Sequence, residues 1–83
     1  MIPVDPKYKW YLYDLGYLLK ERALEAKEKK LLAPANTPER EFESGRALAY
    51  YEVISLLLGQ AVGFDIPLED LRLEDFNPDR DLL

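Results

Sequence analysis

Two carboxylates, Asp14 and Glu52, interrupt the two most apolar stretches of the chain, residues 8–19 and 47–58. In an antiparallel helical hairpin they would lie within about one turn of each other along the axis. Such a pair can share a proton, hold a cation, or act as acid and base. We favour a structural alternative, in which each carboxylate accepts a hydrogen bond at the edge of an apolar face. Unpaired carboxylates are a weak catalytic signature, and the Glu-x-x-His motif of di-metal bundles is absent.

Arg46 is the third candidate polar residue, and it follows Gly45 in an otherwise helical segment. It could contact an anion or anchor an interface, but we favour an ion pair with Glu43, three residues earlier, or with an acidic residue of the first helical segment. Glycine inside a helix costs about 1 kcal/mol relative to alanine, so it usually marks a close approach of another backbone. We therefore expect close packing at Gly45 and also at Gly16.

The composition excludes several kinds of chemistry. The 83 residues include no cysteine and no histidine, which rules out disulfides and removes the commonest zinc ligand. It also rules out catalysis through a cysteine or histidine nucleophile or base. We therefore predict that the protein is not an enzyme and has no metal and no cofactor. A chain this short has a marginal core, so self-association is the remaining route to added stability.

The net charge of −5 argues against nucleic acid and anionic membranes as partners, since both attract positively charged surfaces. Residues 47–64 come closest to a membrane span, but Glu52 and Gln60 interrupt them. Residues 1–6 lack the basic and apolar regions of a signal peptide. We therefore predict no membrane partner and a cytoplasmic location.

Proline after a capping residue marks the start of two helices. Asp5-Pro6 predicts a helix over residues 6–31, and Thr37-Pro38 predicts a second over 38–62 after a turn at 32–37. Apolar residues recur in both segments at helical spacing. Gly63 is the expected left-handed residue at the end of the second helix, with Phe64 folding back onto Leu58.

The last 20 residues, 64–83, form a separate C-terminal segment. Residues 67–73 are compatible with a short helix, and Phe76-Asn77-Pro78-Asp79 predicts a turn. The apolar residues of this segment could cover the apolar end of the hairpin. Whether the segment packs on its own hairpin or on a neighbouring copy stays open from the sequence.

Two long helical segments joined by a short turn predict an all-α fold, a single domain built on a long antiparallel hairpin. Both helices are most apolar at the end of the hairpin far from the turn. In this register Trp10 lies near Gly59. A helix that is apolar on several sides must be covered on several sides, and we therefore predict a homodimer that forms a four-helix bundle. The interface residues we expect are Tyr8, Trp10, Tyr11, Leu12, Leu15, Tyr50, Tyr51, Ile54, Leu57 and Leu58. The aromatic residues of this apolar end could instead form intrachain core or line a ligand pocket.

Three functions are compatible with this sequence. The leading hypothesis is a small non-enzymatic module that self-associates and acts by binding or regulating another protein. The second is a purely self-assembling structural protein. The third is a bundle that binds a small molecule or a metal through Asp14, Glu52 and the tyrosines.

Overall fold

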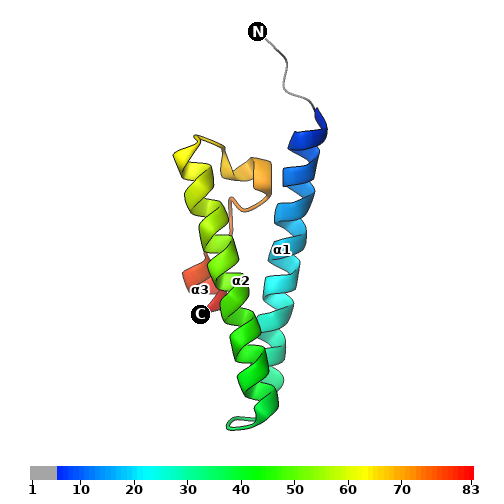
Figure 1. Ribbon diagram of the computed structural model, residues 1–83, viewed down its shortest axis with the longest axis vertical. Coiled ribbons are helices and arrows are strands. Elements are labelled where there is room, and N and C mark those ends of the chain that lie inside the picture. Colours follow the sequence, from blue (N-terminus) through cyan, green and yellow to red (C-terminus); the bar gives the residue numbers. More distant parts are fainter. Residues whose placement is uncertain (1–5) are drawn as a thin grey trace.

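The computed structural model describes residues 6–83, and these residues contain helices and no strand. Helix α1 (Pro6–Leu32) and helix α2 (Pro38–Gly63) run antiparallel as a long hairpin (Figure 1). A 3-10 helix, η1 (Leu68–Leu71), and a short helix, α3 (Pro78–Leu82), follow. The structure thus confirms the predicted all-α fold built on a helical hairpin. Each long helix is one residue longer than its sequence signals predict.

The start of α2 is capped as expected. The Thr37 Oγ1 atom accepts a hydrogen bond of 3.2 Å from the Arg40 backbone N–H, and Pro38 takes the first helical position. Asn36 before it has a positive φ of 64°, a conformation that asparagine adopts more readily than most residues. The turn between the long helices is therefore defined by local chemistry.

The end of α2 differs from the prediction. Gly63 is still helical, and the left-handed residue is Asp65, with φ 55°. The Ile66 N–H donates to the Ala61 carbonyl at 2.8 Å and the Asp65 N–H to the Val62 carbonyl at 3.2 Å, which is a Schellman motif. Phe64 is 72% exposed, so the expected contact with Leu58 is wrong.

Helix α3 begins where a turn was predicted. The Asn77 side chain accepts hydrogen bonds from the backbone N–H groups of Asp79 and Arg80, and Pro78 follows it at the first helical position. This is the same capping device as at Thr37-Pro38. The turn predicted at residues 76–79 is therefore the capped start of a short helix.

The long helices diverge toward the start of α1 and the end of α2, where η1 appears between them in the view of Figure 1, and α3 lies beside α2. Trp10 is 60% exposed, and no atom lies within 4 Å of the position that a Gly59 Cβ would occupy, so the predicted Trp10–Gly59 contact is wrong. The core joins the hairpin to the C-terminal segment. Its buried members are Ala23, Ile54, Ala61, Leu71, Leu73, Phe76 and Leu82.

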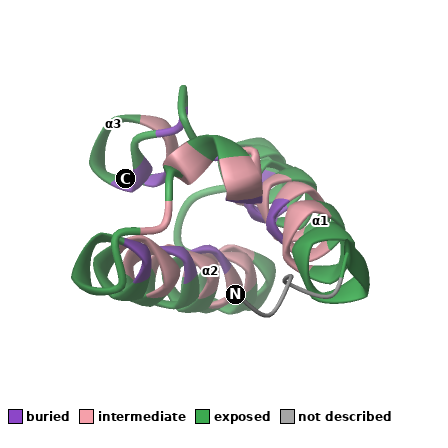
Figure 2. Ribbon diagram, turned by 90° about the horizontal axis from the view of Figure 1, so that it is seen from above, coloured by how far each residue is buried: buried purple, intermediate pink, exposed green. Residues whose placement is uncertain are grey.

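Seen along the long axis, η1 and α3 lie on one side of the two helices (Figure 2). No described segment covers the opposite side of the hairpin. The molecule is therefore elongated, 57 × 21 × 17 Å, with one hairpin side occupied by its own C-terminal segment and the other side open.

Candidate functional site

The C-terminal segment touches α1 most closely at Gly16. A Cβ atom built on Gly16 would lie 2.0 Å from the Leu71 carbonyl oxygen, far inside van der Waals contact. Gly16 is thus the close backbone approach that the sequence predicted, although its neighbour is η1 and not α2. Gly45 is the opposite case, because it is exposed and nothing lies within 4 Å of its Cβ position. The expectation of close packing at Gly45 is therefore wrong.

Arg72 fixes η1 on the same side of α1. Its guanidinium carbon lies 3.9 Å from the centroid of the Tyr13 ring and 4.7 Å from that of Tyr17. Stacking of this kind contributes about 0.5–2 kcal/mol, depending on how far water is excluded. Arg72 also holds a left-handed backbone conformation, φ 56°, at the end of η1. Nothing in the local sequence marks Arg72 for this position, and sequence analysis missed it.

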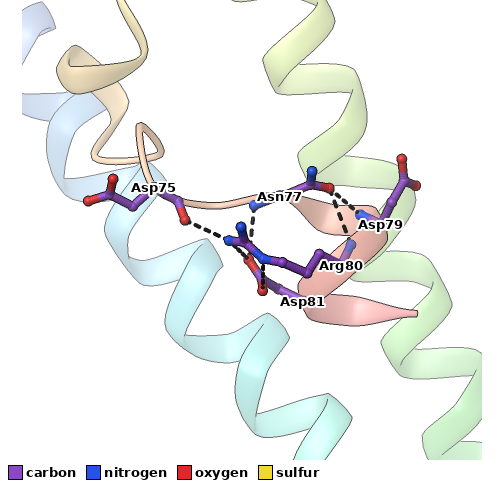
Figure 3. A network of polar contacts seen from close by, with 5 residues as sticks. All are labelled: Asp75, Asn77, Asp79, Arg80 and Asp81. Atoms are coloured by element: carbon purple, nitrogen blue, oxygen red, sulfur yellow. Dashed lines mark hydrogen bonds and ion pairs between the residues drawn. The ribbon is translucent and has the colours of Figure 1, made fainter.

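A polar network closes the C-terminal segment at α3 (Figure 3). The Arg80 side chain pairs with the Asp81 carboxylate at 2.8 Å and donates to the Asp75 carbonyl at 3.0 Å. Asp81 in turn accepts a hydrogen bond from the Asn77 backbone N–H at 2.9 Å. These bonds hold α3 in shape and leave its outer face polar.

One further hydrogen bond ties α3 to the hairpin. The Tyr51 hydroxyl on α2 donates to the Asp79 carboxylate at 2.5 Å. This bond raises the pKa of Tyr51, because it favours the protonated hydroxyl next to a negative charge. Tyr51 therefore marks the side of α2 that faces the C-terminal segment.

Asp81 gives this network a pH dependence. The Arg80 guanidinium, with help from the Asn77 N–H, lowers the pKa of Asp81 from 3.8 to about 2. A lowered folded-state pKa contributes stability that is complete above pH 3.8 and disappears as the pH falls through about 2. We expect NMR titration of the Asp81 carboxyl carbon to give a midpoint near 2. The Arg80→Gln variant should move that midpoint back toward 3.8, and an unchanged midpoint would contradict the assignment.

The uncovered side of the hairpin carries an apolar surface, which we call the open face: Tyr11, Leu15, Leu18, Val53 and Leu57. Residues two apart on a helix lie about 160° apart around its axis. Val53 is therefore nearly opposite Tyr51, and Leu15 nearly opposite Tyr13 and Tyr17. Tyr11 is 64% exposed, Val53 43% and Leu18 39%, while Leu15 and Leu57 are half-buried.

The structure sorts the ten predicted interface residues into three groups. Tyr8, Trp10 and Tyr11 are strongly exposed. Ile54 is fully buried by the chain itself and offers no surface to a partner. The remaining six are half-buried, and four of them pack against the intrachain core: Leu12, Tyr50, Tyr51 and Leu58. The other two, Leu15 and Leu57, belong to the open face.

Asp14 and Glu52 do not converge on a shared site. Both are exposed, and each lies two residues before a buried residue, Gly16 or Ile54, so each points almost directly away from the core. Arg46 forms the predicted ion pair, with its Nε atom 3.0 Å from the Glu43 Oε2 atom. This contact raises the pKa of Arg46 and leaves it fully charged.

Within residues 6–83, no group of three or more acidic side chains is arranged to hold a metal ion. None of the described helices is both long enough and apolar enough to cross a membrane. Compared with protein-family models, with curated proteins and with solved structures, the chain shows no match in any of the three comparisons.

Proposed function

We propose that this protein is a small non-enzymatic interaction module that self-associates through the open face of its hairpin. The observation that supports this proposal is the asymmetry of the hairpin. Its own C-terminal segment lies on one side of the two helices (Figure 2), whereas Tyr11, Leu18 and Val53 on the other side are 64%, 39% and 43% exposed. Contiguous exposed apolar surface on a small protein commonly marks a binding surface.

A second copy fits this surface better than a strongly charged partner. Residues 1–64 contain nine acidic and nine basic residues, whereas residues 65–83 contain seven acidic and only two basic ones. The net negative charge therefore lies in the C-terminal segment. A two-fold contact through the open faces would join two neutral hairpins and keep the two acidic segments on the outside, away from each other. The product would be a four-helix bundle.

The proposal extends to role and location. The acidic outer surfaces of such a dimer would remain free to bind or regulate another protein, and we propose that this occurs in the cytoplasm. Localisation of a tagged protein by fluorescence microscopy would test the second point.

Solution molar mass tests self-association directly. We expect light scattering after size exclusion to give about twice 9.7 kDa for the original sequence. The Val53→Glu variant should dissociate at least tenfold more readily, because each two-fold contact would bury two uncompensated charges. Leu48→Glu on the same helix is the matched control, since Leu48 is 50% exposed but lies outside the open face.

The two variants separate the possible results. Dissociation by Val53→Glu with an intact Leu48→Glu dimer supports the open face as the interface. A monomer at every concentration of the original sequence would contradict self-association. If both substitutions weakened self-association equally, the interface would not be the open face.

A further inference from the structure

A groove lies at the end of the molecule where the long helices diverge, between the first turns of α1 and the segment that leads into η1. Its volume is about 420 Å³, and it is lined by Tyr8, Lys9, Leu12, Ile66 and Asp70. Cavities of about 300–1,000 Å³ are typical of small-ligand sites, which combine an apolar lining with a few polar groups. This groove has that composition and lies outside the five residues of the open face.

The apolar part of the groove is fixed in place by the core. Leu12 and Ile66 are half-buried, and both pack against the buried cluster. Ile66 is also held by its backbone hydrogen bond to the Ala61 carbonyl at the end of α2. The two aliphatic side chains of the groove therefore come from α1 and from the loop between α2 and η1, and both are held by contacts with the same core.

The charged part consists of one cation and one anion on separate elements. Lys9 belongs to α1, whereas Asp70 belongs to η1. A ligand with only a carboxylate would meet the Asp70 charge, and a ligand with only an ammonium group would meet the Lys9 charge. The complementary ligand carries both charges, separated by an apolar body.

We propose that this groove binds a short apolar peptide with free ends, of the size of a dipeptide, with its carboxylate at Lys9 and its ammonium group at Asp70. A single α-amino acid carries both charges on one carbon and offers one side chain to the two aliphatic lining residues. In a dipeptide the charged ends are farther apart, and two aliphatic side chains contact Leu12 and Ile66.

The probe for the test is L-leucyl-L-leucine, titrated into the full chain labelled for methyl NMR. We expect saturable shifts at the Leu12 and Ile66 methyl groups, with a dissociation constant on the order of 1 mM. The N-acetylated dipeptide and the C-terminal amide each lack one charge and should bind about three- to tenfold more weakly. Lys9→Gln should abolish the preference for the free carboxylate alone, and Asp70→Asn the preference for the free ammonium group alone.

The proposal would be overturned by the absence of a saturable shift at Leu12 and Ile66, by equal binding of the blocked dipeptides, or by an unchanged preference in both variants. Stronger binding of decanoate than of the dipeptide would also overturn it in favour of an apolar carboxylate. Because Val53 does not line the groove, repeating the titration with Val53→Glu distinguishes failure of the peptide site from failure of self-association.

Discussion

Replacing Gly16 with alanine is expected to detach the C-terminal segment from α1. The new methyl group would start 2.0 Å from the Leu71 carbonyl oxygen and 2.9 Å from its carbon, and both are backbone atoms that a rotamer change cannot move. Overpacking of this kind costs about 1–3 kcal/mol and occasionally more. Alanine also favours the helix over glycine by about 1 kcal/mol, but this gain applies to α1 whether or not η1 is docked.

The two effects can be measured separately. Far-UV circular dichroism should show helix content that is preserved, while urea unfolding should show a loss of stability. Amide exchange should be faster at Leu71 and Leu73 than in the original sequence. Gly45→Ala is the matched control, because its Cβ position faces open space and the substitution should stabilise the protein by about 0.5–1 kcal/mol. If Gly16→Ala proves as stable as Gly45→Ala, the close approach of η1 to α1 is incorrect.

Truncating Leu73 to alanine is expected to cost about 2–5 kcal/mol of unfolding free energy, the range for fully buried leucines. Leu73 has no exposed surface and lies in the core cluster with Ile54 and Ala23 of the hairpin. A chain of 83 residues has a total stability of roughly 4–12 kcal/mol. One substitution in the C-terminal segment should therefore remove a large share of the stability of the whole fold.

Urea unfolding at a fixed protein concentration tests this prediction, because self-association would make apparent stability depend on concentration. Leu31→Ala is the control, since Leu31 is 60% exposed and its truncation should change stability by no more than about 0.5 kcal/mol. Helix content and Trp10 fluorescence should report the same transition if the hairpin and the C-terminal segment unfold together. A Leu73→Ala variant as stable as Leu31→Ala would mean that the segment is not part of the core.

Together these substitutions measure how much the C-terminal segment contributes to the stability of the hairpin. Three different contacts join the segment to the hairpin: the missing side chain at Gly16, the Arg72 cation stacked on two rings of α1, and the Tyr51 hydrogen bond to Asp79. Its η1 helix lies beside α1 where the long helices diverge, and its α3 helix lies beside α2 (Figure 1). The segment thereby covers only one side of the hairpin, and this is why the open face is available for the proposed dimer.

The sequence by itself determined the two long helices and the turn between them. Thr37-Pro38 sets the start of α2 through groups only a few residues apart, and apolar periodicity maintains each helix along its length. The Glu43–Arg46 ion pair was predictable for the same reason, because side chains three residues apart share a helix face. Each of these interactions joins residues only a few positions apart, so a short stretch of sequence is enough to predict it.

Only the tertiary structure decided how the C-terminal segment and the glycines are used. Gly16 and Gly45 have the same local signature, but one meets the Leu71 carbonyl and the other meets nothing. The hairpin register predicted that the apolar ends would meet, whereas Leu73 and Leu82 from the C-terminal segment pack between the helices. Contacts between residues so distant in sequence depend on which surfaces pack best once the helices have formed. A short window of sequence does not contain that information.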